Sequence, residues 1–218
     1  NKYVPTLFYM LRDAKTGEVV EEQGVFNVEG DGKTVAIDFC PCLPHGKYIL
    51  TVWGGLDELS QLSDDRLSML IHPDKAQGND VYLLNATLVY DAYNYDYTLE
   101  MERIKGKLVV LAENLPDNFD MVHIDANNLY GKVNANFEYS DEASVCNKVA
   151  IASTSLIKTA TYMAPSIMTD GTVLDVNFVK ENNSSGNLLL TPDDVKISME
   201  RNKITCLLYT SPSPRDRG

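Results

Sequence analysis

Long hydrophobic runs are missing from this chain of 218 residues. No stretch reaches about 18 apolar residues, the length that a membrane-spanning helix requires. Positive charge is also scarce, because 19 lysines and arginines stand against 31 aspartates and glutamates, a formal charge of −12. Such an acidic surface repels nucleic-acid phosphates and anionic lipid headgroups. We therefore expect no nucleic-acid partner, and we attribute the charge to solubility.

The residue patterns of catalytic and metal sites are absent as well. The three histidines, His45, His72 and His123, lack the spacing of zinc ligands. The acidic stretches at 116–120 and 125–128 offer oxygen ligands but no EF-hand pattern, so solvated loops are favoured over a calcium site. Neither a Gly-x-Ser-x-Gly elbow nor a phosphate-binding glycine loop occurs. We expect no cofactor, no metal and no enzymatic activity.

Cysteine is rare, with four residues in the chain. Cys206 falls in the stretch 206–218, which resembles the translation of a transposase adapter used in sequencing libraries, so we treat this stretch as a non-native tail outside the fold. Cys40 and Cys42 are separated by one proline, a spacing that we consider too short and stiff for a bridge, and buried reduced side chains are favoured. A disulfide from Cys146 to either of them stays open.

The sequence does contain a clear run of strand-forming residues between two turn signals. A Pro-His-Gly turn at 44–46 precedes the run 47–53, and two glycines at 54–55 end it. Both alternating faces of the run are largely apolar, which favours a central strand buried on both sides of a sheet. We predict that four of its residues belong to the structural core: Tyr48, Leu50, Val52 and Trp53.

Similar strand-like segments recur along the chain, with turn residues between them about every dozen residues. This pattern predicts an all-β fold made of antiparallel sandwiches. Two domains of ordinary size would span residues 1–96 and 97–205. Further strands are predicted at 7–11, 18–21, 35–39, 81–90, 99–111, 122–124, 133–139, 174–178 and 195–199, and a hairpin tip at 182–186.

The connection at 90–97 is unusually rich in tyrosine. If exposed, Tyr93, Tyr95 and Tyr97 would form a candidate interaction patch that stacks on sugar rings or binds protein. If buried, these side chains would pack between two sandwiches and form local hydrogen bonds. We favour the buried interpretation and keep the exposed one as its alternative.

Four landmarks, taken in order, resemble the fimbrial subunits of the Bacteroides group, in particular the FimB-type minor subunits that anchor fimbriae. The first two are the Asp-x-x-Thr-Gly turn at 13–17 and the Leu-Pro-x-Gly-x-Tyr…Trp-Gly block at 43–54. The others are a basic and then apolar strand at 101–110, and the segment 195–205, which ends in Arg-Asn-x-Ile-Thr. The resemblance therefore covers nearly all of residues 1–205.

The resemblance implies two consecutive transthyretin-like β-sandwich domains, the second truncated after Thr205 with an open edge. It further implies a lipoprotein of the outer membrane, held by a lipidated cysteine upstream of Asn1, on the cell surface in a fimbrium. Such a subunit anchors or terminates a polymer of fimbrillin subunits through β-strand addition. The alternative interpretation is a surface carbohydrate-binding lipoprotein built on similar sandwiches.

Overall fold

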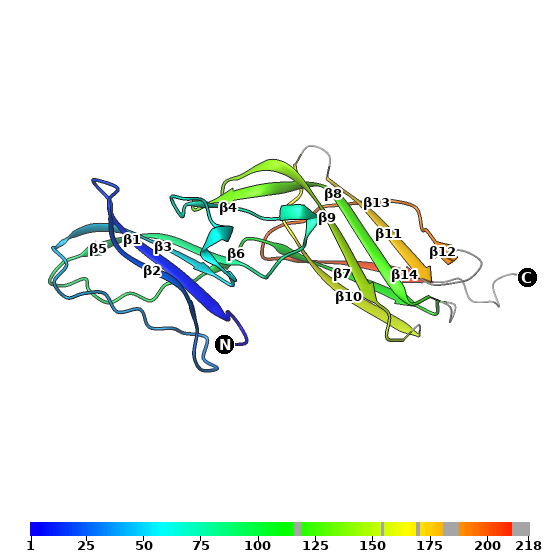
Figure 1. Cartoon of the computed structure of the whole chain (residues 1–218), viewed down its shortest axis with the longest axis horizontal. Coiled ribbons are helices and arrows are strands. Elements are labelled where there is room, and N and C mark those ends of the chain that lie inside the picture. Colours follow the sequence, from blue (N-terminus) through cyan, green and yellow to red (C-terminus); the bar gives the residue numbers. More distant parts are fainter. Residues whose placement is uncertain (116–118, 154, 169–170, 181–187, 211–218) are drawn as a thin grey trace, which may run out of the picture. The chain divides into compact units, whose positions relative to one another are not determined.

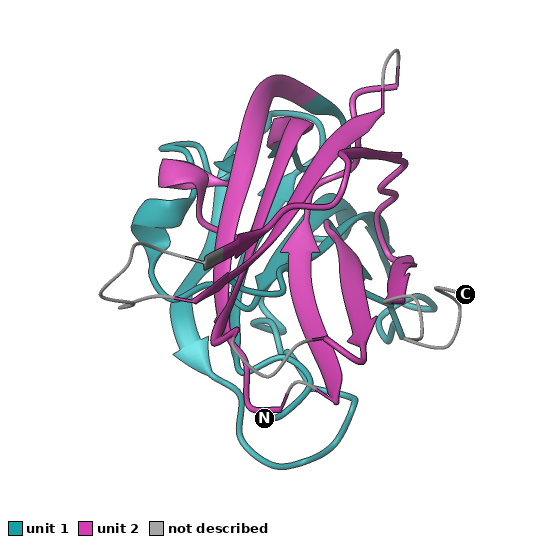
Figure 2. Ribbon diagram, turned by 90° about the vertical axis from the view of Figure 1, so that its right-hand side faces the viewer, with its two compact units in different colours: residues 1–70, 79–104, 133–139 teal, residues 71–78, 105–132, 140–218 magenta. Residues whose placement is uncertain are grey.

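The computed structural model is nearly all β (Figure 1) and describes residues 1–115, 119–153, 155–168, 171–180 and 188–210. The predicted all-β class is confirmed. The chain divides into two compact units (Figure 2): unit 1 holds residues 1–70, 79–104 and 133–139, and unit 2 holds residues 71–78, 105–132 and 140–218. The expected domain ranges 1–96 and 97–205 stay a prediction; in the structure, residues 97–104 group with unit 1.

Unit 1 is built on one antiparallel sheet with the strand order β2-β1-β3-β5-β6. The run predicted at 47–53 is its central strand, with Trp53 opposite Phe8 on one side and opposite Leu83 on the other. The sheet strands are β1 (Thr6–Asp13), β2 (Val19–Asn27), β3 (Gly46–Gly54), β5 (Tyr82–Tyr90) and β6 (Glu102–Arg103). Between β3 and β5 lie η1 (Leu59–Gln61), β4 (Ser68–Leu70) and η2 (Pro73–Lys75).

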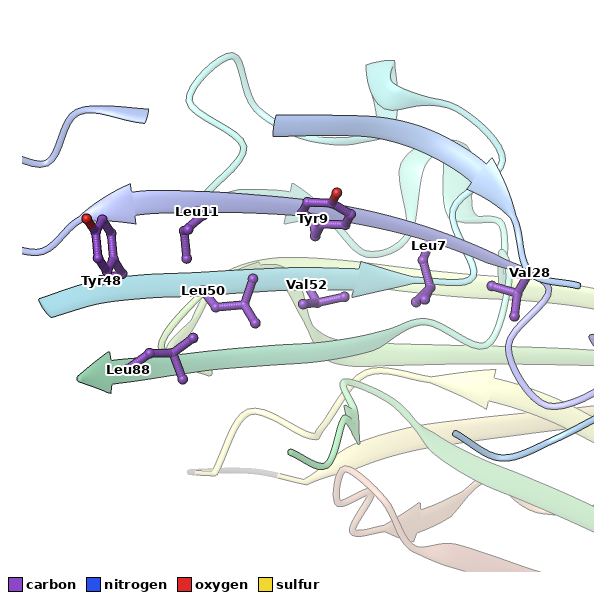
Figure 3. Packing of buried hydrophobic residues seen from close by; sticks show 8 residues of the cluster. All are labelled: Leu7, Tyr9, Leu11, Val28, Tyr48, Leu50, Val52 and Leu88. Atoms are coloured by element: carbon purple, nitrogen blue, oxygen red, sulfur yellow. The ribbon is translucent and has the colours of Figure 1, made fainter. Parts of the chain in front are cut away.

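Both faces of this sheet are buried, because alternate residues of a strand point to opposite sides and both sets are apolar here. One face carries Phe8, Met10, Thr51, Trp53 and Leu83, all at most 1% exposed. The opposite face carries a second cluster, which runs along β1, β3 and β5 in Figure 3 and consists of Leu7, Tyr9, Leu11, Val28, Tyr48, Leu50, Val52 and Leu88.

Unit 2 contains two facing sheets. In one, β7 (Gly106–Glu113) lies between β10 (Leu156–Met163), which is antiparallel to it, and β14 (Ile204–Thr210), which is parallel. The rings of Phe178 and Tyr209 meet edge to face at 5.9 Å between their centroids and join the two sheets. The other sheet has the order β12 (Leu188–Leu190), β11 (Thr172–Lys180), β8 (Met121–Asn134), with β9 (Tyr139–Ala150) beside β8 and β13 (Val195–Ile197) beside β11.

Two of the predicted strands are wrong. Residues 35–39 are irregular, because their alternation reflects only Ile37 and Phe39 packing on the core cluster and no ladder partner accompanies it. Residues 133–139 enclose the hairpin turn between β8 and β9. There the Asn134 side chain accepts the backbone N–H groups of Asn136 and Glu138, a local competition that breaks the ladder.

Two long strands were not predicted, and one segment was excluded from the fold although it takes part in it. Strand β9 has few large apolar residues and interrupts its inward face with Asp141 and Asn147, and β10 points Thr159 and Thr161 inward, so the hydrophobic alternation of both strands is weak. Residues 206–210, expected to lie outside the fold, form most of β14 and pair with β7. Whether 206–218 is native stays a prediction. The hairpin tip expected at 182–186 lies outside the described residues.

Candidate functional site

The four residues predicted for the core lie on both faces of β3. Tyr48, Leu50 and Val52 are 4%, 5% and 2% exposed, and Trp53 is completely buried. The polar atoms of the two aromatic residues are satisfied, because Tyr48 Oη donates to the carbonyl of Pro44 at 2.7 Å and Trp53 Nε1 donates to that of Arg66 at 2.9 Å. These hydrogen bonds hold both ends of the strand to flanking loops.

A groove of about 1050 Å³ runs over the core cluster of unit 1. Its floor is the apolar face of β1, β3 and β5, with Leu50 and Val52 in the centre and Leu84 and Leu88 on β5. Its walls are two irregular segments, 32–43 and 95–101, where a sandwich would have its second sheet. We call this feature the unit 1 groove.

The walls of the unit 1 groove have backbone groups that no strand satisfies. Among the described residues, none forms a backbone hydrogen bond with residues 33–39 or 95–100. Exposed backbone N–H and C=O groups beside an apolar floor are a template for a further strand. The sequence shows a trace of this groove only in the alternation at 35–39, which points Ile37 and Phe39 at the core without making a strand.

Of the two neighbouring cysteines, Cys40 lines the unit 1 groove, and the state of both contradicts our prediction. Cys40 and Cys42 are exposed and joined by a disulfide, with their Cα atoms 5.2 Å apart. A turn closes this distance, because the backbone N–H of Leu43 donates to the carbonyl of Cys40 at 3.1 Å. Cys146 is exposed and free, so the alternative bridge does not form, and Asp125 raises the pKa of its thiol by accepting a hydrogen bond.

The tyrosines of the candidate interaction patch are largely exposed, so the favoured buried interpretation is wrong for two of them. Tyr93 is 91% exposed and Tyr95 is 71% exposed, whereas Tyr97 is 41% exposed and forms hydrogen bonds through its hydroxyl with the backbone of Val89. Tyr95 and Tyr97 line the unit 1 groove. The Asp91 carboxylate accepts the backbone N–H of Tyr93 at 2.8 Å, which lowers the pKa of Asp91 and shapes the turn.

Unit 2 contains a buried polar cluster that the sequence did not predict. The ring of His72 is held by two backbone groups: Nδ1 lies 2.9 Å from the carbonyl of Ala76, and Nε2 accepts the N–H of Ala164 at 2.9 Å. An accepting Nε2 requires a neutral ring, with Nδ1 as the donor. Burial, together with the nearby charge of Lys105, lowers the pKa of His72 from 6.5 to about 4.

Lys105 fixes the same segment from the other side. Its ammonium group is 1% exposed and donates to the carbonyl of Gln77 at 2.5 Å, while the side chain of Gln77 accepts the N–H of Tyr162 at 3.1 Å. These contacts hold the segment 71–78 onto unit 2. We assign the cluster a role in stability, because His72, Lys105 and Gln77 all form hydrogen bonds with backbone groups.

The described residues contain no group of three side chains placed to hold a metal ion. Of the acidic stretches considered for calcium, 116–118 lies outside those residues. Nor does the described part of the chain contain a helix with the length and apolarity to cross a membrane. The groove of unit 1 is therefore the strongest candidate site.

No family model and no curated protein matches the sequence. Solved structures do match. A candidate cell adhesion protein from Bacteroides uniformis gives a TM-score of 0.58 at 10% identity, covering 95% of this chain and 87% of that one. A fimbrial assembly protein from Parabacteroides distasonis gives 0.55 at 12% identity, with coverages of 97% and 85%.

A third structure is the tip fimbrial protein Mfa3 from Porphyromonas gingivalis with a C-terminal truncation. It gives a TM-score of 0.52 at 12% identity and covers 96% of this chain and 90% of that one. Identities this low carry information on the fold alone. The chain therefore has the β-sandwich fold of the Bacteroides-group fimbrial proteins that its sequence landmarks resemble.

Proposed function

We propose that this protein is a structural subunit of a cell-surface fimbria whose unit 1 groove accepts a strand from a neighbouring subunit. The observation that carries the proposal is the groove itself, which has a volume of about 1050 Å³ and an apolar floor. The backbone groups of its walls form no hydrogen bonds with a neighbouring strand among the described residues. The fold shared with fimbrial and cell adhesion proteins supports the fimbrial setting.

An incoming strand would gain from both parts of the groove. Its alternate apolar side chains would cover the partly buried Ile37, Leu43 and Leu84 of the groove, which removes apolar surface from water. Its backbone would pair with 33–39 or 95–100, which supplies ladder hydrogen bonds without demanding one particular sequence. Affinity then comes from the backbone, and register from the side chains that face the floor.

The same proposal includes the position of the subunit in the fimbrium. In the anchoring role that the landmarks suggest, the protein would sit in the outer membrane through an N-terminal lipid and terminate a fimbrillin polymer. The family resemblance alone supports this part. Mass spectrometry of the protein purified from cells that carry the full gene would test it, because a lipid on the N-terminal residue is required.

A synthetic peptide tests strand binding. We expect a peptide of about ten residues that alternates threonine and valine to bind unit 1 and to slow hydrogen exchange at 33–39 or 95–100. The Leu84→Arg variant places a charge on the partly buried groove face of β5, so we expect it to weaken binding at least about tenfold. Isothermal titration calorimetry measures the affinity.

The controls separate groove binding from general adhesion. Thr87→Arg adds the same charge at an exposed position on the opposite face of β5 and is expected to leave the affinity unchanged. A peptide of identical composition with its valines grouped together lacks the strand alternation. Equal binding of the two peptides, or unchanged exchange at both wall segments, would contradict strand addition.

A second candidate function rests on the exposure of two tyrosines. Tyr93 and Tyr95 present their rings to solvent beside the unit 1 groove, and Tyr95 lines it together with Asp96 and Glu100. Aromatic faces next to carboxylates are able to stack on a sugar ring and to accept hydrogen bonds from its hydroxyls. These residues support the surface carbohydrate-binding alternative.

A glycan array tests this alternative. If it is correct, we expect specific binding that falls at least about tenfold in the Tyr93→Ala, Tyr95→Ala double variant, because the stacking faces are lost. Leu156→Ala, which removes an exposed apolar side chain of unit 2 outside the groove, is the control. An array on which no glycan binds above background removes the carbohydrate function and leaves the structural one standing.

A further inference from the structure

The disulfide between Cys40 and Cys42 adds little to the stability of the folded chain. It closes a loop with one residue between its ends, and the entropy that a bridge removes from the unfolded chain is smallest for short loops. The hydrogen bond from Leu43 N–H to the carbonyl of Cys40 holds the same turn without it. Stability alone does not account for this bridge.

Exposure and position give the bridge a chemical role instead. Both sulfur-bearing side chains are exposed, and exposed disulfides are the ones open to attack by a thiolate. Cys40 and Pro41 also line the unit 1 groove, next to the apolar side chains of Phe39 and Leu43. A peptide lying in the groove would therefore pass beside the disulfide.

The local hydrogen bonds distinguish the two sulfurs. The backbone N–H of Cys42 points at Sγ of Cys40 at a distance of 3.3 Å. A negative charge on Cys40 would be stabilised by this donor, as at other thiolates that accept backbone N–H groups. Cys40 is thus the better leaving group, and Cys42 is the sulfur that an incoming thiolate attacks.

We propose that the Cys40–Cys42 disulfide is a thiol-exchange site that captures a cysteine of a strand lying in the unit 1 groove. The thiolate of the partner, its proton released to solvent, attacks Sγ of Cys42. The Cys40–Cys42 bond breaks, its electron pair leaves on Cys40, and that sulfur takes a proton from solvent. The partner cysteine is oxidised to the mixed disulfide, and Cys40 is reduced.

The docking half of this inference rests on the proposed strand binding, whereas the reactivity of the disulfide does not. Within the chain, Cys146 is a poor attacking thiol, because its hydrogen bond to Asp125 disfavours the thiolate. The exchange is reversible. Because Pro41 restricts the backbone between the two cysteines, the Cys40 thiolate stays near the mixed disulfide and can attack it to release the partner.

The test uses the full chain with Cys146→Ser and Cys206→Ser, so that no other cysteine competes with the Cys40–Cys42 disulfide. Three thiols are compared without other reductant: N-acetylcysteine, an alternating threonine–valine peptide with one central cysteine, and a peptide of the same composition with grouped valines. Samples are quenched with N-ethylmaleimide, and adducts are mapped by mass spectrometry. We expect adducts on Cys42, maleimide on Cys40, and a rate for the alternating peptide at least about tenfold above that for the grouped one.

The Leu84→Arg variant separates the two halves. We expect it to remove the tenfold advantage of the alternating peptide over the grouped peptide, whereas Thr87→Arg, at an exposed position outside the groove, keeps that advantage. If no thiol forms an adduct although the alternating peptide binds, the exchange site is wrong and strand binding stands. If N-acetylcysteine reacts while both peptides react equally, capture of a docked strand is wrong together with strand binding. Adducts found mainly on Cys40 would overturn the assignment of the attacked sulfur.

Discussion

Replacing Trp53 with alanine is expected to lower the free energy of unfolding by about 4 kcal/mol, the largest single effect that we expect in unit 1. The side chain is completely buried at the centre of the sheet, opposite Phe8 and Leu83 in the neighbouring strands. Its removal leaves a cavity that the hydrogen-bonded strands around it cannot fill, and it also removes the donor to the carbonyl of Arg66. Urea unfolding followed by far-ultraviolet circular dichroism measures the loss.

Two further variants give this prediction its controls. Trp53→Phe keeps most of the ring volume and loses the indole N–H, so about half of the effect is expected. Thr87→Arg at an exposed position of β5 is expected to change stability by less than about 0.5 kcal/mol. A loss below about 1 kcal/mol for Trp53→Ala would show that this side chain is not an anchor of the core.

Acidification from pH 7 to pH 4 is expected to destabilise the protein by about 3 kcal/mol through His72 alone. The pKa of this residue is near 6.5 in the unfolded chain and about 4 in the folded protein. Between these values the unfolded state binds more protons, so the free energy of unfolding falls as the pH falls. The contribution is fully present above about pH 6.5 and is exhausted at about pH 4.

Comparing the pH dependence of stability in two histidine variants and the parent protein separates the effect of His72 from the titration of carboxylates. His72→Gln cannot take up the proton, so its stability should fall by about 3 kcal/mol less over the same pH range. His45→Gln removes an exposed histidine and is expected to keep the slope of the parent protein. Parallel pH curves for His72→Gln and the parent would contradict the assignment. Urea midpoints at each pH provide the measurement.

Much of the fold could be predicted because hydrophobic alternation and strand burial share one cause. In β3, residues facing either side of the sheet are apolar, and the structure accordingly places this strand at the centre. Prediction failed where a segment has hydrophobic alternation but no strand partner, or has a strand partner but little hydrophobic alternation. At 35–39, Ile37 and Phe39 pack on the core but the backbone has no strand partner, and in β10 two of the four inward positions are threonines, whose hydroxyls hide the pattern.

The candidate site was harder to predict, because its parts come from distant positions. The floor of the unit 1 groove combines three strands, and its walls come from 32–43 and 95–101, which no local pattern connects. The disulfide depended on a turn that brings two Cα atoms to 5.2 Å, and spacing alone suggested the opposite. His72 carried no signal, since its partners are backbone groups of Ala76 and Ala164.

Strand β14 shows how little the edge of β7 requires of the strand beside it. Residues 206–210 resemble translated adapter sequence, yet they pair along β7 in continuous register, with Leu207 and Tyr209 partly buried and Cys206 and Leu208 exposed. Such an edge selects an extended conformation with alternating burial rather than an amino-acid identity. Searches for strands that bind edges of this kind should therefore score periodicity and length, because two equally good strands need share no residue at any position.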